Sequence, residues 1–199
     1  MEINSTLLLV LVACYLIGSI PCGLVVTRLA GHEDIRKKGS GNIGATNVYR
    51  TASKKLGVIT LLLDALKGGG PLFLVLNNFS FSESQYAAVA AVLFLGHCYS
   101  IYLGFKGGKG VATALGIYLV LAPLVVLEAL ILFIFIVWKS RYISMGSISA
   151  ACVVPFLLYY QLHSWPYFAA SALITLVVVI RHKENIERIV HGTESKFKP

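Results

Sequence analysis

Long apolar stretches separated by short polar segments organise the whole chain. The first stretch, residues 5–27, contains 23 residues without a charge, which is enough to span a hydrocarbon core of about 30 Å. Gly18, Pro21 and Gly23 lie in its second half and predict a kink or close helix packing there. Five further apolar stretches follow, at residues 56–77, 86–102, 111–138, 143–160 and 164–180. The pattern predicts an all-α, polytopic membrane helix bundle.

The stretch 111–138 is too long for one ordinary span, and Pro123 lies near its middle. If the stretch were one helix, Lys139 and Arg141 would lie outside the membrane. If it breaks at Pro123, every Lys and Arg except the intramembrane Lys67 falls on one side, as the positive-inside rule favours. We therefore expect about seven transmembrane helices. The N-terminus is then outside and the C-terminus is in the cytoplasm, and the first helix is retained.

Composition supports a membrane protein. Of the 199 residues, 57% are hydrophobic and 13% are charged, and the mean hydropathy is +0.77, which excludes an ordinary soluble domain. We expect one domain spanning residues 1–199. The net charge of +8 is explained by basic residues between spans, so no nucleic-acid partner is expected. The four cysteines are scattered in apolar stretches and form no metal-ligand pattern, so neither a metal nor a cofactor is predicted.

The polar segment 103–113 has the composition of a phosphate-binding loop. Four glycines in residues 104–110 allow backbone N–H groups to surround an anion, and a helix starting near Val111 would point its positive end there. The alternative is a flexible basic turn between two helices. The residues predicted to bind phosphate here are Gly107, Gly108, Lys109 and Gly110.

The polar segment 32–55 is also rich in glycine. Gly39, Gly41 and Gly44 match G-x-G-x-x-G, but a transmembrane helix precedes them where a dinucleotide fold needs a strand, so that fold is excluded. The alternative is a solvated loop with ordinary turn residues. The side chains able to hold phosphate or hydroxyl groups are those of Ser40, Asn42, Thr46, Asn47 and Arg50.

Two charges interrupt the second apolar stretch. Asp64 and Lys67 are three residues apart, on one helix face, and can neutralise each other. Intramembrane charges are expensive and also mark functional sites. Because no glycine-rich loop or polar cluster adjoins them, we favour a structural ion pair. Glu128 is expected to have a polar partner.

The C-terminal segment, residues 181–199, places His182 and Asn185 on one helix face, and Gly192 predicts the helix end. Ser144 and Ser147 lie one turn apart at the inner end of the sixth helix. A lone His is more often a surface residue. The convergence of three polar segments on one membrane face favours a functional role.

Three motifs occur together in this order: GSGNIGATNVYR at residues 39–50, GFKGGKGVAT at 104–113 and HKENIERIVHGTE at 182–194. With these motifs, essentially the whole chain resembles the bacterial membrane glycerol-3-phosphate acyltransferases that use acyl phosphate. The resemblance implies a seven-helix protein of the cytoplasmic (inner) membrane with its active site facing the cytoplasm. It implies that a fatty acyl group passes from acyl phosphate to the 1-hydroxyl of glycerol 3-phosphate, giving lysophosphatidic acid and phosphate.

The resemblance also implies roles for particular residues. It makes the second motif the glycerol 3-phosphate loop, makes Ser40, Arg50, His182 and Asn185 essential, and makes Glu194 structural. In such a site Lys109 and Arg50 supply positive charge. The side chains expected to supply hydrogen bonds are those of Ser40, Thr46, Asn47 and Ser147.

The expected chemistry needs no covalent enzyme intermediate, because acyl phosphate is already an activated mixed anhydride. The H-x-x-x-x-D pair of other glycerolipid acyltransferases is absent from the sequence. Either His182 or the donor's own phosphate takes the hydroxyl proton. We favour the phosphate, since neither glycine motif contains a carboxylate.

The expected partners are glycerol 3-phosphate, fatty acyl phosphate and membrane lipid, with a monomeric protein. The alternative function is a small transporter or flippase for a phosphorylated metabolite. Transporters often have duplicated halves, and none of the three motifs has a second copy.

Overall fold

The structure is a computed structural model that describes residues 5–197, and every regular element within that range is a helix. The all-α prediction is therefore confirmed. The chain divides into two compact units, an N-terminal unit ending at Val120 and a C-terminal unit beginning at Leu121. The predicted break near Pro123 is also confirmed. Helix α6 (Val111–Leu121) ends there, and α7 (Pro123–Ser140) starts with proline, which has no N–H to leave unpaired at a helix start.

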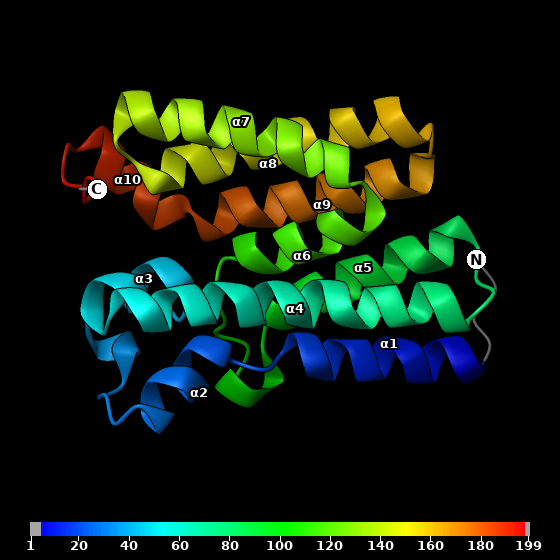
Figure 1. Cartoon of the computed structure of the whole chain (residues 1–199), viewed down its shortest axis with the longest axis horizontal. Coiled ribbons are helices and arrows are strands. Elements are labelled where there is room, and N and C mark those ends of the chain that lie inside the picture. Colours follow the sequence, from blue (N-terminus) through cyan, green and yellow to red (C-terminus); the bar gives the residue numbers. More distant parts are fainter. Residues whose placement is uncertain (1–4, 198–199) are drawn as a thin grey trace. The chain divides into compact units, whose positions relative to one another are not determined.

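The N-terminal unit brings α1, α4 and α5 together, with α2 and α3 packed on α4 (Figure 1). The first apolar stretch is two helices bent by 44°, because the chain breaks between Gly18 and Cys22 around Pro21. The kink expected there is thus present. The elements before α6 are α1 (Ser5–Gly18), α2 (Cys22–Leu29), η1 (Ile35–Lys37), α3 (Ala45–Thr51), α4 (Lys54–Asn78), α5 (Glu83–Cys98) and η2 (Ile101–Leu103).

Serine caps define the two long helices of this unit. The Ser53 hydroxyl accepts a hydrogen bond from the backbone N–H of Leu56 at 3.1 Å and starts α4. Ser82 and Gln85 form a capping box at the start of α5. Helix α5 ends at Cys98, four residues earlier than the apolar pattern predicts, and the chain then turns through η2.

Glycines let the backbones of these helices approach closely. A Cβ added at Gly69 of α4 would lie 2.5 Å from the carbonyl oxygen of Gly116 in α6. A Cβ at Gly96 of α5 would lie 2.6 Å from the carbonyl oxygen of Tyr15 in α1. Small residues allow such packing between helices in a membrane, where dispersion contacts replace the hydrophobic driving force.

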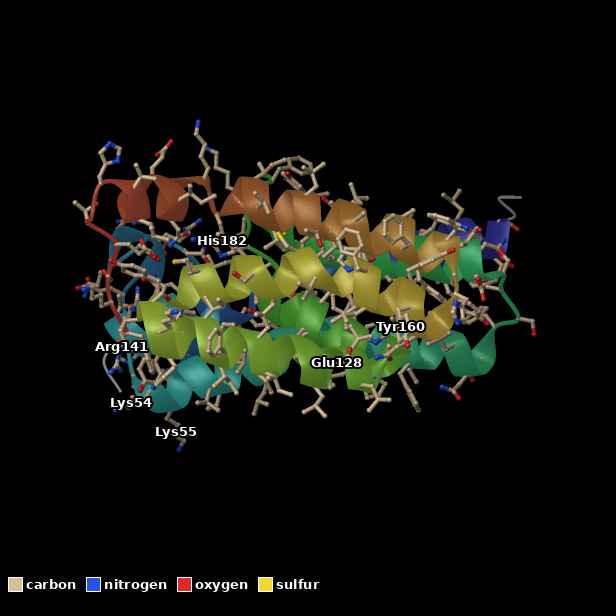
Figure 2. All side chains as sticks on the ribbon, turned by 90° about the horizontal axis from the view of Figure 1, so that it is seen from above. Lys54, Lys55, Glu128, Arg141, Tyr160 and His182 are labelled. Carbon is tan, nitrogen blue, oxygen red and sulfur yellow. The ribbon has the colours of Figure 1, made fainter. Side chains whose placement is uncertain are left out.

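The C-terminal unit packs α7 on α8 and α8 on α9 (Figure 1). Its elements are α7, α8 (Ile143–Leu162), α9 (Trp165–Arg181) and α10 (Lys183–Val190). The connections from α7 to α8 and from α8 to α9 are short because Arg141 and His163 adopt the left-handed conformation, with φ of 65° and 50°. Arg141 and His182 lie toward one end of this unit, and Glu128 and Tyr160 toward the other (Figure 2). The polar partner expected for Glu128 is Gln161, whose Nε2 donates to its carboxylate at 3.2 Å.

Four helices of the described range are long and apolar enough to cross a membrane, namely α4, α5 with η2, α7 and α8. The count rises to six if the bent pairs α1–α2 and α9–α10 are one span each; the second pair bends by 52°. Helix α6 is apolar but has only 11 residues. The structure is therefore that of a polytopic helical membrane protein.

The glycine packing predicts a contrast between two neighbours in α4. Gly69→Ala should destabilise the protein by about 1–3 kcal/mol, because its Cβ would press on the α6 backbone. Gly70→Ala is the control, since its Cβ would meet only the side chain of Leu66, with Cδ1 at 3.4 Å and Cγ at 3.9 Å. We expect Gly70→Ala to leave the thermal unfolding midpoint in detergent unchanged or slightly higher. Equal midpoints for the two variants would contradict the close approach.

Candidate functional site

The segment 32–55 is held in shape by the side chain of Asn47. Its Oδ1 accepts a hydrogen bond from the Ser40 backbone N–H at 2.9 Å. Its Nδ2 donates to the carbonyl oxygens of Ile35, Lys38 and Asn42 at 3.1, 3.2 and 2.8 Å. The side chain is 3% exposed. Asn47 therefore satisfies the backbone of the loop, which is a different task from the substrate contact expected for it.

Other predicted residues of this segment face solvent. Ser40, Thr46 and Arg50 are exposed, and Thr46 and Arg50 are four residues apart on α3, so they share a face. Asn42 is half-buried, and its Oδ1 accepts a hydrogen bond from the Gly44 N–H at 2.8 Å. The segment thus presents two hydroxyls and a guanidinium on its surface.

An apolar cluster brings the two glycine-rich segments together. Ile35, Ile43 and Val48 of the first segment are buried with Leu24 of α2, and Leu103, at the start of the second segment, packs against them. The two segments therefore meet within the N-terminal unit.

The segment 103–113 folds back against the end of α5. The backbone N–H of Gly107 donates to the Cys98 carbonyl at 3.1 Å, and that of Gly108 to the His97 carbonyl at 3.0 Å. These carbonyls belong to the last turn of α5, where no helical N–H is available to them. Gly110 has a φ of 82°, and a Cβ there would overlap the Phe94 ring.

This arrangement corrects one expectation about the loop. The N–H groups of Gly107 and Gly108 were expected to face an anion, but they are bonded to the end of α5. The N–H groups suited to an anion are instead those of the first turn of α6, which starts at Val111. Lys109 is half-buried immediately before that turn. The backbone N–H groups that could hold an anion therefore lie a few residues further along the chain than Gly107 and Gly108.

The ion pair expected between Asp64 and Lys67 is present. Lys67 Nζ lies 2.8 Å from Asp64 Oδ1 and donates a hydrogen bond to the Ile20 carbonyl at 2.6 Å. The expectation that no polar group or glycine loop adjoins the pair is wrong. His97 Nδ1 lies 3.6 Å from Asp64 Oδ1, and the ring of His97 fills the space where Gly108 lacks a side chain. Sequence reasoning missed His97, although it is a lone histidine at the end of an apolar helix just before the loop.

The C-terminal unit contains the other predicted polar cluster, and its C-terminal segment is described up to residue 197. His182 occupies the bend between α9 and α10 and is 4% exposed. Its Nδ1 is 2.8 Å from the Val178 carbonyl. A carbonyl only accepts hydrogen bonds, so Nδ1 carries a proton, and Nε2 is the acceptor nitrogen of the neutral ring. Nε2 is therefore the nitrogen able to take a proton.

Glu194 joins residues of two helices, α8 and α10. Its Oε1 accepts hydrogen bonds from Ser144 Oγ at 2.9 Å and Asn185 Nδ2 at 2.6 Å, and its Oε2 accepts one from Arg188 Nε at 2.7 Å. Burial alone raises the pKa of Glu194. The bonds from Arg188, Asn185 and Ser144 outweigh that effect and hold its pKa below the usual value. The carboxylate thus stays ionised and fastens the chain after α10 to α8.

Ser147 and Asn185 are both buried beside this network. Ser147 Oγ donates to the Ile143 carbonyl at 3.0 Å, so its oxygen is left to accept a hydrogen bond. Asn185 uses an amide hydrogen on Glu194, which orients its side chain. The predicted end of α10 at Gly192 is confirmed, with a φ of 69° just after His191. Between residues 5 and 197 the structure has no cluster of three His, Cys, Asp or Glu side chains suited to a metal.

Known glycerol-3-phosphate acyltransferases align with almost the whole chain. The chain is 55% identical over 190 residues to the glycerol-3-phosphate acyltransferase of Syntrophotalea carbinolica, a match that covers 96% of this chain and 97% of that one. It is 51% identical over 192 residues to the protein of the same name from Geobacter sulfurreducens, with 96% and 97% covered.

Solved structures give the same result. The fold is similar to that of PlsY (YgiH), an integral membrane glycerol 3-phosphate acyltransferase, in its glycerol 3-phosphate form. The TM-score is 0.92 at 36% identity, covering 98% of this chain and 96% of that one. The TM-score is 0.90 with the lysophosphatidic acid form of the same protein. A sequence model of the glycerol-3-phosphate acyltransferase family matches residues 8–192. The chain therefore belongs to the glycerol-3-phosphate acyltransferase family.

Proposed function

We propose that this protein transfers a fatty acyl group from acyl phosphate to the 1-hydroxyl of glycerol 3-phosphate. The products are lysophosphatidic acid and inorganic phosphate. The strongest support is the fold shared with PlsY over nearly the whole chain. The two forms of PlsY are named for glycerol 3-phosphate and for lysophosphatidic acid, which differ by one acyl group and are therefore acceptor and product of an acyl transfer.

The phosphate of glycerol 3-phosphate binds at the first turn of α6. Backbone N–H groups there lack helical acceptors, and the helix dipole favours an anion. Lys109 precedes that turn and supplies a compact positive charge. Arg50, exposed on α3 of the same unit, supplies a second cation with a planar donor set that suits phosphate. Two cations offset the repulsion between two phosphate-bearing substrates.

In the transfer step, the acceptor hydroxyl oxygen attacks the acyl carbonyl carbon, and the bond from that carbon to the phosphate oxygen breaks. The hydroxyl proton goes to the phosphate, which leaves with it. His182 and Asn185 orient the hydroxyl, and Ser40 and Ser147 provide further hydrogen bonds. Alignment of the two bound substrates is the main source of rate acceleration in such a reaction, because the donor is already activated.

Two of the predicted site residues act at a distance from substrate. The side chain of Asn47 is hydrogen-bonded to the backbone of residues 35–42, so its role is to hold Ser40 in place. Glu194 orients Asn185 and anchors the C-terminal segment, which supports the structural role expected for it. Thr46 and Asn42 remain substrate-binding candidates on the surface of the first segment.

The protein lies in the bacterial cytoplasmic membrane as a monomer, with its N-terminus outside. Seven spans result if both bent pairs and the short α6 cross the bilayer. Basic residues at the ends of α7 and α9 belong to one end of the C-terminal unit, which supports a single cytoplasmic face for the polar segments. The active site then faces the cytoplasm and the acyl chain enters from the bilayer.

The direct test is an assay of purified protein in detergent or lipid discs. Acyl phosphate and glycerol 3-phosphate together should release inorganic phosphate and form lysophosphatidic acid in equal amounts. Acyl phosphate alone should release phosphate at no more than the rate without protein. Uptake of a phosphorylated metabolite into vesicles without acylation would instead indicate the transporter alternative.

The geometry of residues 107 and 108 predicts that alanine at either position weakens binding of glycerol 3-phosphate and not of acyl phosphate. In Gly108→Ala the new Cβ would overlap the His97 ring, and in Gly107→Ala it would overlap the His97 carbonyl. Either displaces the turn leading into α6, so the KM for glycerol 3-phosphate should rise by about 10- to 100-fold. The KM for acyl phosphate should change little, and Gly70→Ala serves as the control. An unchanged dependence on glycerol 3-phosphate in both variants would exclude the loop from acceptor binding.

Membrane sidedness is tested with single cysteines at Ser82 and Ser140 in a background without the four native cysteines. A thiol reagent that cannot cross the membrane should label position 82 in intact cells. It should label position 140 only after the membrane is opened, because the basic residues next to it are retained inside. Labelling of position 140 from outside would show that α6 and α7 make a single crossing.

The proton acceptor is tested by His182→Asn. General-base catalysis accelerates the chemical step by about 10²–10⁴-fold. Loss of a base would therefore remove nearly all activity. If His182 only orients the hydroxyl, Asn replaces one hydrogen bond, and the variant keeps measurable activity and the acid limb of the parent's pH profile. His191→Asn is the control, since His191 is exposed just after α10. A folded but inactive His182→Asn, or one without the acid limb, would make His182 the base.

A further inference from the structure

His97 connects the buried ion pair to the glycine-rich segment. It is the second-last residue of α5 and is 3% exposed. On one side its Nδ1 faces the carboxylate of Asp64 at 3.6 Å, and that carboxylate is also held by Lys67 at 2.8 Å. This separation is longer than a hydrogen bond, so the contact is electrostatic, and a carboxylate favours an N–H on this side of the ring because it only accepts hydrogen bonds. A charged group from another helix thus favours one orientation of the imidazole.

On its other side the same ring meets the loop. A Cβ added at Gly108 would overlap Nε2 of His97, so the edge of the ring lies where a side chain at 108 would be. The backbone of His97 also accepts the hydrogen bond from the Gly108 N–H at 3.0 Å. One residue thus fixes Gly108 through both its ring and its carbonyl, three positions before α6 begins.

We propose that His97 is a positioning residue for acceptor binding. With Asp64 and Lys67 behind it, the imidazole holds Gly108, and through it Lys109 and the first turn of α6, in the geometry that binds the phosphate of glycerol 3-phosphate. The inference rests on the proposed function, because it assigns the acceptor phosphate to that turn. It also gives the buried ion pair a task beyond neutralising its own charges.

The proposed role of His97 predicts that its loss changes the KM for one substrate and leaves the other kinetic constants nearly unchanged. His97→Asn keeps an amide where Nδ1 faces Asp64, so the buried carboxylate retains a partner, but it removes the ring edge beside Gly108. The KM for glycerol 3-phosphate should rise about tenfold or more. The kcat and the KM for acyl phosphate should stay within about twofold. His97→Gln, whose amide reaches the place of Nε2, should recover most of the affinity.

A double-variant test isolates the ring contact. Ala at 108 collides with the His97 ring, whereas Ala at 107 collides with the backbone of His97 and Cys98. Removing the ring should therefore relieve the first collision only. The KM for glycerol 3-phosphate in His97→Asn/Gly108→Ala should be no higher than in Gly108→Ala alone. In His97→Asn/Gly107→Ala the collision with the backbone remains, so the KM for glycerol 3-phosphate should be higher than in Gly107→Ala alone.

Three kinetic results would overturn the proposal. These are an unchanged KM for glycerol 3-phosphate in His97→Asn, equal losses in kcat and in both KM values, or the same behaviour of the two double variants. Failure of both His97→Asn and His97→Gln to fold would also overturn it, since the ring would then only support the unit. The parent's phosphate release is measured first. An inactive parent contradicts the proposed function, whereas an active parent with an unaffected His97→Asn contradicts this inference alone.

Discussion

The buried pair of Asp64 and Lys67 is the interaction on which the N-terminal unit depends. Both side chains come from α4 and are less than 8% exposed. Lys67 reaches the carbonyl of Ile20 at the break between α1 and α2, and Asp64 reaches His97 of α5. Removing one partner of such a pair costs about 3–5 kcal/mol because the other charge is left buried alone. The pair therefore links the kinked first span to the helix before the glycine loop.

A second constraint is that irregular backbone beside a membrane needs internal hydrogen-bond partners. The three polar segments contain such backbone, and the hydrogen-bonding groups of each are satisfied by a different kind of partner. Asn47 bonds the backbone of the first segment, the last carbonyls of α5 bond Gly107 and Gly108, and Glu194 ties the chain after α10 to α8. The proposed function assigns substrate binding to other groups close by, such as the first turn of α6. In that proposal, different groups of the same segment hold the loop and bind the ligand.

Much of the fold is predictable from the sequence. The apolar stretches predict the helices within a few residues, because a membrane span needs a continuous run of apolar side chains. Pro123 predicts the break between α6 and α7, and Gly18 with Pro21 predicts the bend after α1. The least accurate boundary is the end of α5. Residues 99–102 continue the apolar pattern, but the chain turns there so that residues 107 and 108 can bond the end of the helix.

The sequence by itself determined the family, the helical class and the positions of the polar segments to which we assign the chemistry, because these depend on composition, spacing and local motifs. Only the tertiary structure decided which atoms of those segments are already engaged. Asn47 cannot be distinguished from a substrate ligand by spacing, since its partners lie 5 to 12 residues away on a folded loop. His97 and Gly108 meet only when the loop folds back on α5. Contacts between residues distant in the chain depend on packing, which no local pattern encodes.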